Sequence, residues 1–259
     1  MRPVRAILFD YGHTLVDFHR TEEALRDAYE QIGARIEAVA YMEVPELLDL
    51  IERVAGGVDR MVEESYRQRR LEELDIVAVF RESLAAVGFD LPDDVLQHII
   101  AVDHSAYSRS ITIEPDMLGV LRDLRRRGYR TALVSNVTLL PRLMRQDLEA
   151  QGLAPLMDAL VFSSEVRVRK PDPRIFRHAL DEIGAHPSEA VFVGDRLNDD
   201  VTGARGVGMR AVQTVQFRTE EDPEVSPDGR IEHLSELPSL LETWGGYSSS
   251  SVSEGEARS

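Results

Sequence analysis

The 259-residue sequence contains no cysteine. Without thiols the protein can form no disulfide, no thiol nucleophile and no thiolate metal site, so a bound metal would need oxygen or imidazole ligands. Long hydrophobic runs are also missing: the N-terminus lacks the apolar core and cleavage pattern of a signal peptide, and no later stretch is long enough to span a membrane. These absences predict a cytoplasmic protein that has no membrane partner.

Positive charge is scarce, with 30 Lys and Arg residues against 46 Asp and Glu residues and a formal net charge of -16. We therefore expect no nucleic-acid partner, because binding a phosphate backbone normally requires a basic surface. Lysine itself is nearly absent: of the 30 Lys and Arg residues, Lys170 is the only lysine. Because lysine presents a compact point charge, Lys170 is a candidate for a tight pocket around one oxygen atom. Chance retention on a solvated surface is the alternative.

Hydrophobic residues make up 43% of the chain, which is enough for one large domain or two modest ones. In the second half of the chain, short apolar runs alternate with amphipathic helical patterns. This alternation predicts an α/β fold with a doubly wound parallel sheet. Strands are expected at 6–9, 129–134, 160–162, 190–193 and 211–215, helices at about 115–127, 139–150, 173–183, 199–205 and 237–244, and a surface loop at 218–230.

Residues 17–110 contain only helical patterns and are predicted to form an all-helical insert. The chain then divides into an α/β core at 1–16 and 111–245, the insert at 17–110, and a Ser-rich, disordered tail at 246–259. Within the insert we expect a helix capped by Thr21, a second from near Pro45 to the Gly56-Gly57 pair, and further helices at 58–71, 75–87 and 92–108.

Polar residues close the predicted strands. Asp10, Ser135 and Asp195 each follow an apolar run directly, and Lys170 lies in the loop after another. The carboxyl ends of parallel strands meet at one edge of the sheet, where open α/β folds bind ligands. Carboxylates that meet there, with Asp200 five residues after Asp195, would repel one another unless a divalent cation lay between them. Oxygen ligands favour magnesium, and the remaining donors suit a phosphate.

The segments FDYGHTL, LVSN, KPDP and VGDRLNDD resemble the signature motifs of the haloacid dehalogenase-like hydrolase superfamily, in the same order. The helical insert resembles the cap that many members carry. The resemblance implies a Rossmann-like core and a phosphatase that acts on a small phosphorylated metabolite through an aspartyl-phosphate on Asp10. It also implies that Ser135, Asn136 and Lys170 hold the transferring phosphoryl group. We expect a monomer or a homodimer.

The same resemblance implies a magnesium cofactor. The carboxylates of Asp10 and Asp195 and the backbone carbonyl of Gly12 would bind the ion, and Asp200 would be a ligand or would support one. Position 12 is also a departure, because most phosphatases of the superfamily have a second aspartate there. That side chain protonates the leaving oxygen, and such proton transfer typically raises the reaction rate by a factor of about 10² to 10⁴.

The residues beside Gly12 are candidates for the missing proton transfer. Histidine is suited to proton transfer near neutrality, which makes His13 a candidate, and Tyr11 also flanks the site. The alternative is that the His13 side chain points away into the turn. Related chemistries fit less well. Metal-free dehalogenation is not favoured by the acidic pair Asp195 and Asp200, and phosphonate cleavage needs a cap lysine that residues 17–110 lack. A catalytically weakened phosphate-binding or regulatory protein remains an alternative.

Overall fold

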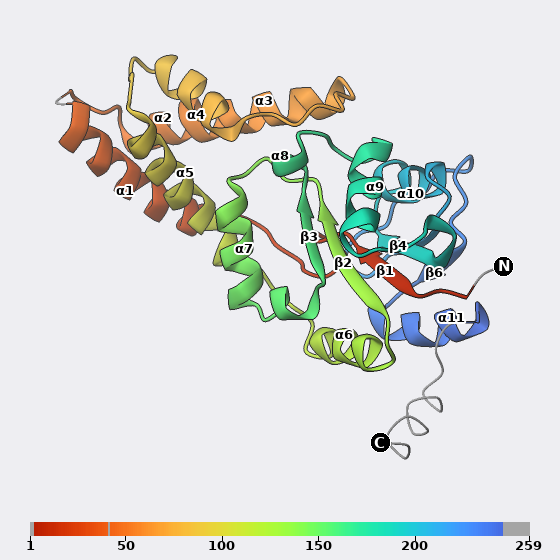
Figure 1. Cartoon of the computed structure of the whole chain (residues 1–259). Coiled ribbons are helices and arrows are strands. Elements are labelled where there is room, and N and C mark those ends of the chain that lie inside the picture. Colours follow the sequence, from red (N-terminus) through yellow and green to blue (C-terminus); the bar gives the residue numbers. More distant parts are fainter. Residues whose placement is uncertain (1–2, 41, 246–259) are drawn as a thin grey trace. The chain divides into compact units, whose positions relative to one another are not determined.

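The computed structural model describes residues 3–40 and 42–245, so the predicted tail at 246–259 lies outside the described residues. The chain forms two compact units (Figure 1). The first contains the chain up to Asp17, Thr112–Val137 and the residues from Leu148 onward, and the second contains Phe18–Ile111 and Thr138–Asp147. The division into a catalytic core and a cap that we predict for these regions is functional, and it stays a prediction.

The first unit is built on a six-stranded, fully parallel sheet with the order β3-β2-β1-β4-β5-β6. The chain starts at a central strand, builds outward on one side, and then returns to build the other side. This confirms the doubly wound α/β fold and makes the carboxyl end of β1 the switch point. The strands are β1 (Ala6–Phe9), β2 (Arg130–Ser135), β3 (Ala159–Phe162), β4 (Ala190–Gly194), β5 (Arg210–Thr214) and β6 (Gly229–Ile231).

All four residues of β1 are buried, which explains why the strand is a continuous apolar run rather than an alternating one. A hydrophobic cluster joins one face of the sheet to a helix: Leu8, Val134 and Phe192 pack with Ile175 and Phe176. From residue 112 onward the helical segments are α6 (Met117–Arg126), α7 (Pro141–Ala150), η2 (Ala154–Leu156), α8 (Ser163–Val166), α9 (Pro173–Glu182), η3 (Pro187–Glu189), η4 (Leu197–Thr202), α10 (Gly203–Gly206), η5 (Leu234–Glu236) and α11 (Leu237–Thr243), of which α7 lies mostly in the second unit.

The region between β1 and β2 is helical, as predicted, and the described residues of 18–111 contain no strand. Thr21 caps the first helix through its Oγ1, which accepts a hydrogen bond from Ala24 N–H at 3.2 Å. No helix of the described residues is both long and apolar enough to cross a membrane. The segments are α1 (Glu22–Ala40), α2 (Leu47–Leu50), η1 (Ile51–Ala55), α3 (Gly56–Arg67), α4 (Ile76–Ala85) and α5 (Asp93–Ser108).

The prediction that a helix ends at Gly56-Gly57 is wrong. Helical structure runs from Leu47 through the π-helical segment η1 into α3 and ends at Arg67. A Cβ atom on Gly57 would lie 2.3 Å from Ser83 Oγ. That hydroxyl donates a hydrogen bond to the Val54 carbonyl at 2.9 Å. Glycine therefore stands at this position because α4 packs closely against it, and not because the helix terminates.

Residues 138–147 belong to the helical unit, although the sequence places them within the α/β alternation. Two contacts join them to that unit: Asp147 Oδ2 lies 2.6 Å from His104 Nε2, and Thr138 Oγ1 donates to Glu73 Oε1 at 2.8 Å.

The strand β6 is not among the strands that the sequence predicts. It lies at the end of an acidic segment rich in proline and glycine, where the local pattern indicates a loop.

Candidate active site

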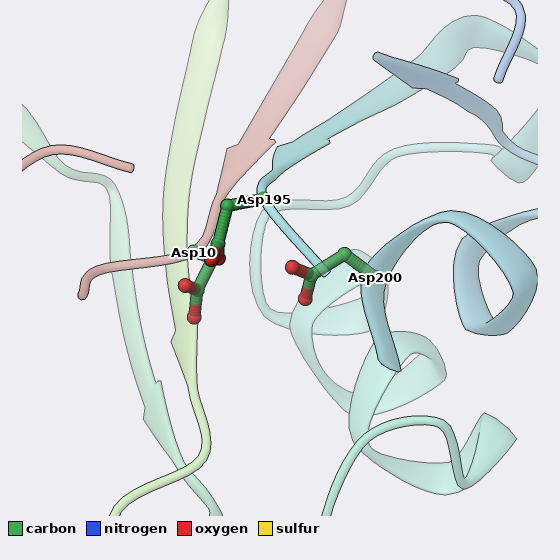
Figure 2. A group of neighbouring side chains, drawn as sticks. All are labelled: Asp10, Asp195 and Asp200. Carbon is green, nitrogen blue, oxygen red and sulfur yellow. The ribbon is translucent and has the colours of Figure 1, made fainter. Parts of the chain in front are cut away.

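Three aspartates meet at the carboxyl end of the sheet. Asp10 follows β1, Asp195 follows the neighbouring β4, and Asp200 lies in η4. Figure 2 shows their carboxyl groups directed toward one another. Each offers an oxygen within 4.8 Å of the others, and all three residues are buried. The Asp10 N–H donates to the Val193 carbonyl at 2.9 Å, which ties the end of β1 to β4.

Gly194 allows Asp200 to approach the strand end. A Cβ atom at this position would lie 2.3 Å from Asp200 Oδ2, so any larger residue would displace that carboxylate. This close approach requires glycine at position 194. Asp200 Oδ2 also accepts a hydrogen bond from Arg196 N–H at 2.9 Å, which fixes the side chain against its own segment.

Lys170 lies between two of these carboxylates. Its Nζ is 2.6 Å from Asp10 Oδ1 and 2.7 Å from Asp200 Oδ1, and the residue is only 4% exposed. The alternative of chance retention on a solvated surface is therefore wrong. Asn136 holds the backbone of this lysine: its Oδ1 accepts from Lys170 N–H at 2.7 Å and its Nδ2 donates to the Lys170 carbonyl at 3.0 Å.

Burial governs the ionisation of the site. It raises the pKa of Asp10, Asp195 and Asp200, in the last case to about 6, and neighbouring carboxylates add to the effect while Lys170 opposes it. For Lys170, burial alone would lower the pKa, but the Asp10 and Asp200 carboxylates together hold it above its ordinary value. The ionised form of these carboxyl groups is therefore disfavoured by burial and favoured by the nearby cations.

The donor set fits a divalent cation. Asp195 is 1% exposed, and its Oδ1 is buried without a hydrogen-bond partner. Such an oxygen is costly to bury unless another group binds it. An atom of this kind beside two further carboxylates suits magnesium, which prefers oxygen ligands.

The other predicted site residues lie around this cluster. Ser135 is the buried last residue of β2, the strand beside β1. Gly12 is half-buried in the turn after Asp10, where it forms a bridge with Val16. His13 follows with a φ of 57°, and its Nδ1 lies 3.1 Å from Asp17 Oδ1. A catalytic role for His13 stays a prediction.

The sequence gives no sign of Arg218, which contacts the site from the loop after β5. One of its guanidinium nitrogens, Nη2, donates to Asp195 Oδ2. In a chain whose basic residues are almost all arginine, nothing in the local pattern distinguishes this one. Tyr11, which the sequence suggests as a flanking group, is buried, and its hydroxyl donates to Gln151 Oε1 at 3.0 Å.

Known proteins resemble this chain along most of its length. The family model described as haloacid dehalogenase-like hydrolase matches residues 4–208. A phosphoserine phosphatase of Thermus thermophilus is 40% identical over 239 residues, which cover 90% of each chain. An (S)-2-haloacid dehalogenase of a Pseudomonas species is 28% identical over 244 residues, covering 93% of this chain and 98% of that one.

Solved structures resemble the fold as well. A crystal structure of a HAD phosphatase from Thermococcus onnurineus aligns with a TM-score of 0.61 and 25% identity, covering 95% of this chain and 100% of that one. The strand order, the buried aspartates at the strand ends and the extent of the sequence match agree. The chain belongs to the haloacid dehalogenase-like hydrolases.

Proposed function

We propose that this hydrolase is a magnesium-dependent phosphatase that acts on small phosphate monoesters, with phosphoserine as the first substrate to test. The placement of Lys170 between Asp10 and Asp200, beside the unpartnered oxygen of Asp195, carries the proposal. In this arrangement Asp10 would be the nucleophile and Lys170 the cation that binds phosphate oxygens, and the neighbouring carboxylates would suit a metal. The relative from Thermus thermophilus supports the choice of substrate.

Asp10, Asp195 and the Gly12 carbonyl would hold the magnesium ion. Both oxygens of Asp200 already accept hydrogen bonds, Oδ1 from Lys170 and Oδ2 from Arg196 N–H. Asp200 therefore suits a supporting role better than that of a direct ligand. Magnesium bound there would neutralise negative charge that gathers on the phosphoryl oxygens during transfer.

The first chemical step would be the attack of the Asp10 carboxylate on the phosphorus atom. The bond between phosphorus and the ester oxygen breaks, the electron pair leaves with that oxygen, and the phosphoryl group becomes bound to Asp10. Lys170 Nζ and the Ser135 hydroxyl would donate hydrogen bonds to the phosphoryl oxygens. Asn136 would act indirectly, because its side chain holds the Lys170 backbone.

In the second step a water molecule attacks the phosphorus of the aspartyl-phosphate. Inorganic phosphate leaves, and the Asp10 carboxylate is restored. The departing alcohol must gain a proton in the first step and the attacking water must lose one in the second. Position 12 has no side chain that could perform either transfer, so we propose that solvent or His13 takes this role.

The experiment is a measurement of phosphate release from phosphoserine and a panel of phosphorylated metabolites. We expect turnover with Mg²⁺, none in excess EDTA, and none for Asp10→Asn, which keeps the shape of the side chain without its nucleophile. Turnover in EDTA would contradict the metal requirement. Retained turnover in Asp10→Asn would contradict the nucleophile.

Gly12 favours a second candidate, a phosphate-binding or regulatory protein with little turnover. Binding of inorganic phosphate in the presence of Mg²⁺ without hydrolysis of any ester would support it.

The same panel should include a 2-haloacid, because a dehalogenase is among the relatives. We expect no halide release, since the buried aspartates favour a metal-dependent reaction.

A further inference from the structure

A short segment between β5 and β6, residues 216–220, is tied down on both sides of Arg218. Gln216 Oε1 accepts a hydrogen bond from Leu234 N–H at 3.0 Å. The Glu220 carbonyl accepts one from the side chain of Gln213 in β5, at 2.8 Å. We refer to residues 216–220 as the clasp. Its two anchors restrict where Arg218 can place its guanidinium group.

The clasp contacts two elements of the proposed metal site. Arg218 Nη2 donates to Asp195 Oδ2. Glu220 Oε2 accepts a hydrogen bond from Leu197 N–H at 2.7 Å, and Leu197 is the first residue of η4, the segment that carries Asp200. The clasp therefore contacts Asp195 directly through Arg218. It contacts Asp200 only indirectly, because Glu220 binds the first residue of η4.

As a result, the two oxygens of the Asp195 carboxylate have different surroundings. Oδ2 is bonded to Arg218, whereas Oδ1 is buried and has no hydrogen-bond partner. A carboxylate that can rotate must lose this freedom when it binds a cation. A donor fixed on one oxygen removes that freedom in advance and determines which oxygen is presented.

We propose that Arg218 is a positioning residue that holds Asp195 with Oδ1 presented to magnesium, and that Glu220 fixes the segment that carries Asp200. The inference rests on the magnesium site of the proposed function. It adds a group outside the four motifs, because Arg218 and Glu220 lie in the loop that follows β5.

Charge and position act in opposite directions here, which makes the proposal testable. The guanidinium group repels a divalent cation, so its removal would strengthen Mg²⁺ binding if charge were its only effect. Its removal would weaken Mg²⁺ binding if its main effect were to hold Asp195 in place. The direction of the change therefore separates a positioning residue from a competing cation.

The test is the affinity of the substrate-free, full-length protein for Mg²⁺, measured by isothermal titration calorimetry. Arg218→Gln should bind Mg²⁺ about 10- to 100-fold more weakly than the wild type, the usual effect of losing a group that orients a metal ligand. Arg218→Lys should recover part of the affinity, because it keeps a charged donor. Glu220→Ala should weaken binding to a smaller extent. The Mg²⁺-induced rise in Tm gives a second readout.

Arg205→Gln is the matched control. Arg205 Nη1 donates to the Ser226 carbonyl at 2.6 Å, so this arginine anchors the same loop without a described contact to the aspartates. Its Mg²⁺ affinity should equal that of the wild type. Equal or tighter binding by Arg218→Gln, or an equal loss in Arg205→Gln, would overturn the inference. Absence of Mg²⁺ binding by the wild type would overturn the metal site of the proposed function itself.

Discussion

Lys170 is nearly enclosed, and both of its ionic partners are buried carboxylates. Lys170→Met would leave Asp10 and Asp200 without their shared cation, so the free energy of unfolding in EDTA should fall by about 3–5 kcal/mol. Denaturant unfolding at neutral pH measures this loss. The double variant Lys170→Met/Asp200→Asn should recover part of it, because it also removes one of the two carboxylates.

Lys170→Arg tests the shape of the cation rather than its charge. The variant keeps the positive charge and should lose less stability than Lys170→Met. It should still lose most phosphatase activity, because a planar guanidinium group replaces a compact ammonium that sits at 2.6 and 2.7 Å from two oxygens. A fully active Lys170→Arg enzyme would show that the site needs only a positive charge.

With glycine at position 12, the rate of hydrolysis should depend strongly on the leaving group of the substrate. Aryl phosphates need little protonation as they depart, so they should be cleaved far faster than alkyl phosphates. Gly12→Asp places a carboxylate where the family resemblance implies a proton donor, and it should raise kcat on alkyl phosphates by about 10-fold or more. Steady-state kinetics on matched aryl and alkyl substrates measures both effects.

The control for this prediction is His13→Ala. His13 is oriented by Asp17, so it is the neighbouring group whose proton transfer could replace that of an aspartate. If Gly12→Asp gives no gain while His13→Ala loses activity on alkyl but not aryl phosphates, His13 performs the transfer. The proton donor would then be present rather than missing.

At the scale of the helices, Gly57 determines how closely α3 and α4 approach. Gly57→Ala would place a methyl group 2.3 Å from Ser83 Oγ and should disturb its hydrogen bond to the Val54 carbonyl. We expect a loss of about 1–3 kcal/mol in the free energy of unfolding, measured by denaturant titration.

Gly119→Ala is the comparison for Gly57→Ala. Gly119 lies in α6, and a Cβ atom there would lie within 4 Å of nothing beyond its chain neighbours and the backbone of its own helix. This substitution should stabilise the protein by about 0.5–1 kcal/mol, because alanine favours a helix interior. Equal effects at the two glycines would mean that packing against Ser83 is unimportant.

Two sequence-based predictions of secondary structure differ from the structure, and the differences have related causes. Gly56-Gly57 has the composition of a helix end, and the segment that contains β6 has the composition of a loop. In both places a partner distant in sequence decides the outcome: Ser83 packs against Gly57, and β5 pairs with β6. Local propensity is too weak to override such contacts.

For the complete chain, apolar periodicity and the four motifs are local features, and they were enough to predict the α/β class, the helical insert and the family. They also predicted that the aspartates and the lysine meet at one sheet edge, because the carboxyl ends of parallel strands lie there. How these side chains are held depends on contacts that form only in the folded chain. Asn136 on the Lys170 backbone, Arg218 on Asp195 and Glu220 on Leu197 are contacts between residues 34, 23 and 23 positions apart. No periodicity records such pairs, because they depend on which strand ends and loops the folded sheet brings together.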